Sequence, residues 1–169
     1  MTSAPTALPL AGLWRRFGAF VHELLFLLAW MFITGLVFAA LSGESMTAGR
    51  PQILTGALAA LQQLYFFVVI GAYFIYFWTN GRRSLACKTW SLRLANTSGG
   101  TISTRQAVVR YLATWIGPAL GLVLYSVFGA RLGAWWLPAC LFNFVWAFVD
   151  RDHQFLHDRI AGTRVLLAD

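Results

Sequence analysis

Uncharged, apolar residues dominate long stretches of the chain, and polar residues gather in the segments between them. From Leu24 to Leu41 there are 18 consecutive residues without a charge, close to the length of helix that crosses a bilayer. A second charge-free run covers residues 52–79, and a third covers residues 111–149 apart from Arg131. These runs predict a helical membrane protein.

The third run is too long for one span, and its glycines divide it. Residues 129–133 read Gly-Ala-Arg-Leu-Gly, which is typical of a tight turn between two antiparallel helices. A re-entrant pair is the alternative. The fold class is therefore all-α, with four transmembrane helices at about residues 17–41, 53–79, 107–128 and 132–149. We expect a flexible tail over residues 1–14 and a single domain over residues 15–169, with a tail over residues 150–169.

The segment between the second and third spans has local structure of its own. Residues 88–94 alternate between polar and apolar side chains, residues 96–100 have turn chemistry, and residues 101–103 could return as a second strand. This pattern predicts a short hairpin at the membrane surface. Ser103 and Gln106 have the spacing of a capping box, which would start the third helix.

Composition agrees with a membrane protein. The chain is 59% hydrophobic and only 11% charged, whereas soluble domains average about 25% charged residues. Its net charge of +7 does not indicate nucleic-acid binding, because the basic residues flank the apolar runs. Eleven of the thirteen lie before span one, between spans two and three, or after span four: Arg15, Arg16, Arg82, Arg83, Lys88, Arg93, Arg105, Arg110, Arg151, Arg159 and Arg164. By the positive-inside rule, both termini and the middle loop are cytoplasmic.

Several chemistries have no support in the sequence. Cys87 and Cys140 show neither a metal-binding spacing nor an evident pairing. No nucleophile elbow or phosphate-binding glycine loop occurs, so we expect neither an enzyme nor a bound cofactor. Gly117 and Gly121 have the GxxxG spacing of close helix contact, within the protomer or between two copies.

Glu23 is the residue that most needs an explanation. It enters the first apolar run seven residues after Arg16, so both project from one helix face about 10 Å apart along the axis. Acids inside a membrane are costly and often functional. Glu23 could carry a proton, bind an ion, or pair with an arginine such as Arg110. The alternative is a local pairing at headgroup level.

The C-terminal stretch concentrates charge beside the membrane. It holds three carboxylates, Asp150, Asp152 and Asp158, among three arginines. His153 and His157 are four residues apart and would share a helix face, as metal ligands do. Gln154 occupies the place of the catalytic glutamate of zinc proteases, so we expect no metal site. A charge-paired segment that docks on the basic loop is the favoured interpretation.

Four motifs together make the chain resemble the RDD family of bacterial membrane proteins. They are Arg-Arg-x-x-Ala-x-x-x-acid-Leu-Leu from Arg15, the loop over residues 84–94, Arg-Tyr-Leu from Arg110, and the closing segment over residues 156–165. The closing segment is the most specific, and the resemblance covers nearly the whole chain after the tail. It implies a multi-pass protein of the bacterial inner membrane.

The family is named for one arginine and two aspartates, and the resemblance assigns counterparts to them. The arginine matches Arg16 or Arg15, the first aspartate matches Glu23, and the second matches Asp158. Glutamate keeps the carboxylate on a longer arm, and Ala86 stands where the family loop usually has glycine. The family's molecular role is unsettled. Ligand transport has been suggested, and sodium/proton exchange is attributed to some members.

Two function hypotheses follow. In the first, the protein is a cation/proton exchanger or ligand carrier. Glu23 is the titrating group, and Arg16 tunes the titration of Glu23. Four spans make a thin wall for a pathway, so this version implies a homo-oligomer in the lipid bilayer. In the second, it is a non-transport membrane factor: Arg16, Glu23, Arg110 and Asp158 form a structural charge network, and the loop binds a partner. A water-reachable cavity at Glu23 would favour the first.

Overall fold

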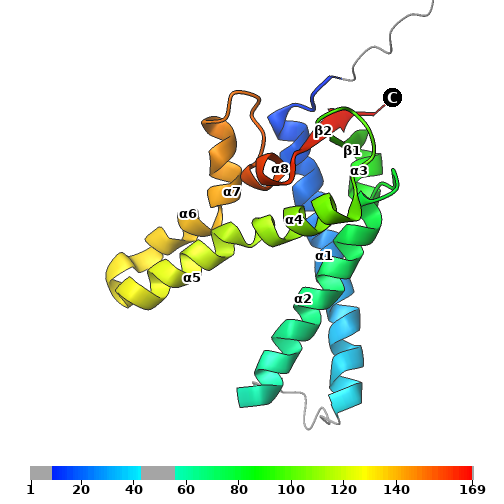
Figure 1. Cartoon of the computed structure of the whole chain (residues 1–169). Helices are drawn as coiled ribbons and strands as arrows, with labels where there is room; N and C mark the ends of the chain where they lie inside the picture. The colour runs from blue at the N-terminus through cyan, green and yellow to red at the C-terminus, as the bar shows by residue number, and fades with distance from the viewer. Residues whose placement is uncertain (1–8, 43–55, 169) are drawn as a thin grey trace, which may run out of the picture.

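The two longest helices form the trunk of the molecule (Figure 1). The computed structural model describes residues 9–42 and 56–168, and these helices are α1 (Leu13–Ser42) and α2 (Gly56–Trp78). The Tyr65 hydroxyl donates a hydrogen bond to the carbonyl of Thr34 at 3.2 Å and joins them. Outward-facing apolar side chains are exposed, as lipid contact requires. Both helices agree with predicted spans, and the loop with Arg50 lies outside the described residues.

The third long helix is made of two parts. The capping box predicted at Ser103 is present, because Ser103 and Gln106 bond to each other's backbone N–H groups at 3.3 and 3.1 Å. It starts α4 (Thr104–Thr114), and α5 (Ile116–Phe128) follows after Trp115. By length and composition, α1, α2 and the combined α4–α5 helix are each able to cross a membrane.

A proline explains the break between α4 and α5. Pro118 has no N–H to donate to the carbonyl of Thr114, four residues earlier. The side-chain amide of Asn143 replaces this donor, with hydrogen bonds to the carbonyls of Ala113 and Thr114 at 3.2 and 2.8 Å. Asn143 belongs to α7 (Phe142–Val145) and is 2% exposed. It therefore fastens the chain after α5 to the broken helix.

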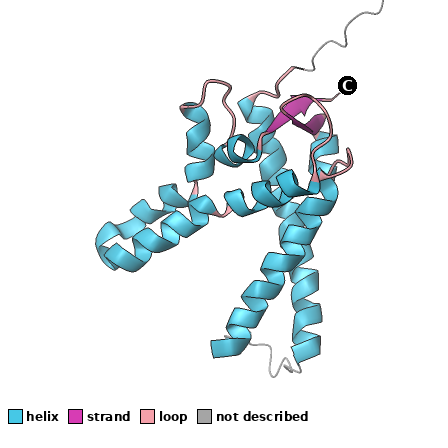
Figure 2. Cartoon of the chain, in the orientation of Figure 1, coloured by secondary structure: helices cyan, strands magenta, loops and turns pink. Residues whose placement is uncertain are grey.

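The fourth predicted span is not a continuous helix. Residues 129–148 form short pieces: η2 (Gly129–Trp135), α6 (Trp136–Cys140), α7 and η3 (Trp146–Phe148). Gly133, in the predicted turn, has a φ of 54° that interrupts η2. The α5–α6 hairpin projects to one side of the trunk (Figure 1). The described part of the chain is mostly helical, with three candidate spans rather than four (Figure 2).

The predicted GxxxG contact lies inside the protomer. A Cβ atom at Gly117 would clash with the backbone carbonyl of Cys140, and one at Gly121 would clash with the Cys140 thiol. Both glycines therefore allow α5 to approach α6 closely. This explains why the hairpin needs small residues at these two positions.

A cap of short elements closes one end of the trunk. We use the name cap for residues 9–11, α3 (Leu85–Thr89), β1 (Leu92–Asn96), α8 (Leu156–Ala161) and β2 (Thr163–Leu167). β1 pairs with β2 in antiparallel register, from Leu92 opposite Leu167 to Asn96 opposite Thr163. The sequence predicts a return strand at residues 101–103, but the pairing partner of β1 comes from the C-terminal segment instead.

The residues just before α1 also belong to the cap. Ala11 donates a backbone hydrogen bond to Val165 at 3.0 Å, and Leu167 donates one to Pro9 at 2.9 Å. Residues 9–11 are therefore bonded to β2, and α1 begins at Leu13. Most of the predicted tail, residues 1–8, lies outside the described residues. Apolar side chains of residues 11 and 19, of β1 and of β2 form a common core beneath the strands.

Candidate functional site

A buried ion pair joins α4 to the cap. The guanidinium of Arg110 lies 2.9 Å from Oδ1 of Asp158 in α8, and the two side chains are 8% and 0% exposed. The Thr163 hydroxyl donates to the same carboxylate oxygen at 3.1 Å. The Arg110 guanidinium also stacks 4.5 Å above the Trp78 ring of α2. The charge of Arg110 is therefore neutralised by Asp158 away from water.

His157 lies against this pair as a neutral base. Its Nε2 atom is 3.4 Å from a guanidinium nitrogen of Arg110. Because arginine offers no acceptor, Nε2 can accept this hydrogen bond only in the tautomer that carries the imidazole proton on Nδ1. Burial lowers the pKa of His157 to about 4, Arg110 acts in the same direction, and Asp158 opposes both. The imidazole is therefore uncharged at neutral pH.

Glu23 is held by hydroxyl groups. Tyr73 of α2 donates to Oε1 at 2.5 Å, and Ser84 donates to Oε2 at 2.5 Å. The side chain is on α1 and only 9% exposed. Ser84 is also the N-cap of α3, where its hydroxyl accepts a bond from the backbone of Cys87. No salt bridge involves Glu23 within the described residues, so the carboxylate is not neutralised by a cation there.

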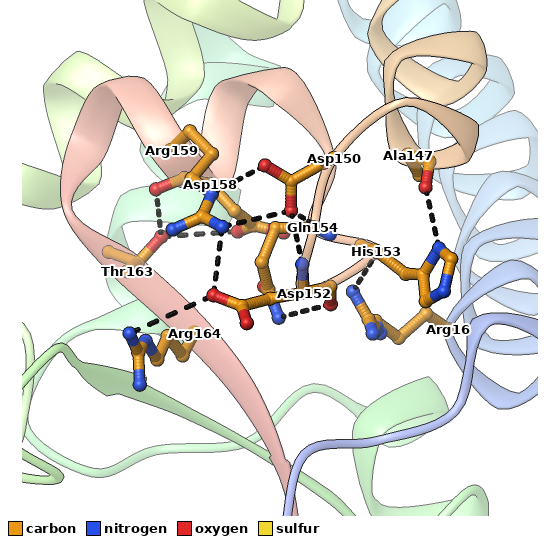
Figure 3. Close-up of polar contacts among 10 residues, drawn as sticks. All are labelled: Arg16, Ala147, Asp150, Asp152, His153, Gln154, Asp158, Arg159, Thr163 and Arg164. Atoms are coloured by element: carbon orange, nitrogen blue, oxygen red, sulfur yellow. Dashed lines mark hydrogen bonds and ion pairs between the residues drawn. The ribbon is translucent and has the colours of Figure 1, made fainter.

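Arg16 binds backbone carbonyls from both ends of the chain. It donates to the carbonyl of Ala11 and to that of His153, each at 2.7 Å, and it is 4% exposed. Arg15 is exposed. Arg16 is therefore the arginine of the buried cluster, and it holds the turn before α8 against the start of α1 (Figure 3).

A second set of ion pairs lies nearer the surface. Arg159 bonds to Asp150 at 2.7 and 3.1 Å and to Asp152 at 2.8 Å, and Arg164 approaches Asp152 at 4.0 Å (Figure 3). The hydrogen bond from Arg159 holds the pKa of Asp150 below its usual range. Asp150 and Asp152 therefore pair with arginines of the C-terminal segment itself. The C-terminal segment contacts the middle loop through backbone hydrogen bonds between β1 and β2.

A cavity of about 390 Å³ opens beside the buried cluster. Its polar lining comes from four elements: Arg16 and Glu23 of α1, Arg110 and Thr114 of α4, Asn143 of α7 and His157 of α8. The rest of the wall is apolar and aromatic. The volume lies in the range of small-molecule sites, about 300–1,000 Å³. The arrangement can therefore hold a small ligand against Glu23, whose carboxylate has no ion pair in the part of the chain that the structure describes.

The structure brings the predicted site residues together only in part. Arg110 pairs with Asp158 and not with Glu23, while Arg16 and Glu23 use separate partners on the same cavity wall. His153 lies in the turn before α8 with a φ of 50°, so it does not share a helix face with His157. Within the described residues, no group of three or more His, Cys, Asp or Glu side chains could hold a metal ion.

Three participants were not predicted from the sequence: Tyr73, Ser84 and Asn143. Tyr73 is one of many aromatic residues in its span, so nothing singles it out. Ser84 could have been found, because serine is a preferred N-cap residue whose hydroxyl accepts a hydrogen bond from a backbone N–H in the first turn of the helix. Asn143 could also have been found, because a polar amide in an apolar run needs partners and Pro118 leaves a carbonyl without one.

The fold and the site define a helical membrane protein whose ionisable residues gather at one end of its long helices. The chain belongs to the RDD family: the family model matches residues 10–162. The match runs from the residues of the cap before α1 to the end of α8, so it includes Arg16, Glu23 and Asp158. No curated protein and no solved structure matches the chain.

Proposed function

We propose that the protein carries a small cation across the membrane in exchange for protons, with Glu23 binding each in turn. The observation that carries this proposal is the environment of Glu23. Its carboxylate lies on a cavity wall in a long apolar helix and is bonded to the hydroxyls of Tyr73 and Ser84. A carboxylate without a fixed positive partner can exchange a proton for a cation.

The orientation proposed is that of a bacterial inner-membrane protein with the cap in the cytoplasm. The basic residues of the middle loop and of the C-terminal segment lie at this end, as the positive-inside rule expects. Residues 9–11 bond to β2, so the chain between them crosses the membrane an even number of times. The combined α4–α5 helix and residues 129–148 then either both cross, as the four-span prediction has it, or return together as a re-entrant pair.

A thin bundle also favours a homo-oligomer. Few long helices surround the cavity, and α1 and α2 are mostly exposed along their lengths. A complete pathway would need further walls, which a second copy of the chain could supply. This part of the proposal is testable by the mass of the protein in a calibrated detergent or nanodisc preparation.

The direct test is cation-driven proton flux in proteoliposomes. Wild type should acidify or alkalinise the lumen when a sodium or potassium gradient is imposed, and Glu23→Gln should abolish that response. Asp152→Asn is the matched control, because it removes a carboxylate that pairs at the surface and does not line the cavity. Equal flux from wild type and Glu23→Gln would exclude Glu23 as the carrier.

One observation supports the non-transport alternative. Arg16, Arg110 and Asp158 all serve to fasten the cap, through bonds to residues 11 and 153 and through the buried pair. In that version the charges are structural, and the loop containing α3 and β1 is the surface for a partner. Absence of any cation-driven flux from a well-folded wild-type protein would favour this alternative.

A further inference from the structure

Glu23 lies at the boundary between two parts of the cavity. Along α1, Arg16 is seven residues nearer the cap, about 10 Å along the axis, and Met31 is eight residues further from it, about 12 Å. All three residues line the cavity. The wall of α1 thus carries its two charges at Arg16 and Glu23, with Ala19 and Phe20 between them, and it is entirely apolar beyond Glu23.

The second helix repeats this order. Tyr73 bonds to Glu23 and so marks its level on α2. Trp78, five residues nearer the cap, carries the stacked guanidinium of Arg110, whereas Phe74 and Ile70 continue the cavity wall, with Ile70 further from the cap. Both arginines therefore lie on the cap side of Glu23, and the deep side is apolar and aromatic.

The deep side offers little to an inorganic ion. Its hydroxyl groups have partners already: Tyr111 donates to the carbonyl of Phe67 at 2.6 Å, and Thr114 donates to the carbonyl of Tyr111 at 2.6 Å. The remaining deep lining includes Leu27, Met31, Pro118 and the amide of Asn143, whose side-chain oxygen has no hydrogen-bond partner among the described residues. Such a wall stabilises an apolar body and gives few oxygen ligands to a metal cation.

We propose that the cavity binds a lipophilic organic cation, with its charge against Glu23 and its apolar body on the deep side. The proposal rests on the exchange function and adds lipophilic organic cations to the cations that Glu23 would exchange. A weakly hydrated cation gains from aromatic faces such as Phe74 and from the carboxylate. Arg110 does not repel it strongly, because Asp158 neutralises that guanidinium at 2.9 Å. Binding needs only loss of a proton from Glu23 and no covalent step.

The test is equilibrium binding of radiolabelled tetraphenylphosphonium to the full-length protein in nanodiscs. We expect saturable binding by wild type and by Asp152→Asn, and at least tenfold weaker binding by Glu23→Gln. Tetraphenylborate has the same shape and the opposite charge, so it should show no saturable binding beyond that of empty nanodiscs. Equal or tighter saturable binding of tetraphenylborate, or unchanged binding by Glu23→Gln, would overturn the proposal.

A second pair of variants tests the deep side without touching the carboxylate. Met31→Trp fills the cavity and should abolish binding, whereas Phe32→Trp, at a position 69% exposed to the lipid side, should leave binding intact. Binding by Met31→Trp at wild-type strength would place the ligand elsewhere and overturn the proposal. If no tetraphenylphosphonium binds while sodium still drives Glu23-dependent proton flux, this inference fails and the exchange function stands. If that flux is also independent of Glu23, both fail.

Discussion

The carboxylate of Asp158 has no exposed surface and meets the guanidinium of Arg110 at 2.9 Å. The two residues are 48 positions apart in the chain, on α8 and α4, so this contact fixes the cap to the third long helix. Taking two charges out of water is costly, and their mutual attraction offsets that cost only while both are present. The pair is therefore a stabilising contact whose loss leaves a buried charge.

Asp158→Asn should lower the free energy of unfolding by about 3–5 kcal/mol, because Arg110 keeps its charge without a counterion. Thermal unfolding in detergent, followed by tryptophan fluorescence, measures the change. Asp152→Asn removes a more exposed pair and should cost about 0–1 kcal/mol. A similar small cost for both variants would show that the buried pair contributes little. Arg110→Met combined with Asp158→Asn should cost less than the sum of the single changes.

Asn143→Leu should destabilise the protein by about 1–3 kcal/mol for each carbonyl that loses its donor. The carbonyl of Thr114 would lose its donor at the break in the third helix, and the carbonyl of Ala113 would keep only the backbone N–H of Trp115. Pro118→Ala restores a backbone N–H opposite Thr114, so it should recover part of the loss in the double variant. Unfolding of the four proteins in a double-mutant cycle gives the coupling. Simple additivity would contradict the explanation of the break.

The long helices could be predicted from the sequence because apolar runs without charge have few alternatives in a membrane protein. The residues matched to the family motif also gather at one end of the trunk, at Arg16, Glu23, Arg110 and Asp158. Their pairing could not be predicted. Spacing along α1 relates Arg16 to Glu23, but the partners of Glu23 come from α2 and the loop, which no local pattern connects to α1.

The cap illustrates the same limit. The alternation over residues 88–94 indicates a strand, and β1 is found at Leu92–Asn96. Its partner lies about 70 residues away, and a five-residue strand carries no signal for a partner at that separation. Residues 101–103 are the candidate partner nearest to β1 in the sequence. β1 pairs instead with β2, at five positions. Long-range pairing therefore decided this part of the fold.

Gly117→Ala should be more damaging than Gly121→Ala. At Gly117 the added methyl group meets the backbone carbonyl of Cys140, which cannot move aside, whereas at Gly121 it meets a thiol that can rotate. Overpacking typically costs about 1–3 kcal/mol. Cys140→Ala should rescue Gly121→Ala and leave Gly117→Ala unchanged, as judged by thermal unfolding. Rescue of both variants would mean that the backbone contact is not the cause.

His157 should make the protein less stable as the pH falls from about 6.5 to about 4. Its folded pKa is about 4 because the imidazole is buried, whereas the unfolded chain has the usual value near 6.5. Between these values the unfolded state binds a proton that the folded state does not, so acid favours unfolding. The difference amounts to about 3 kcal/mol over the whole window.

Thermal unfolding of wild type and His157→Gln at a series of pH values measures this effect. Glutamine retains an acceptor for Arg110 but does not titrate, so its stability should vary less between pH 6.5 and 4. The groups that face His157 are Arg110 from α4 and its neighbour Asp158, and both are present in each protein. The hydrogen bond from Arg159 lowers the pKa of Asp150. The stability that Asp150 contributes is therefore lost only when the pH falls below its usual pKa of about 3.8, outside the window between pH 6.5 and 4. Parallel curves for the two proteins between pH 6.5 and 4 would show that His157 is not the titrating group.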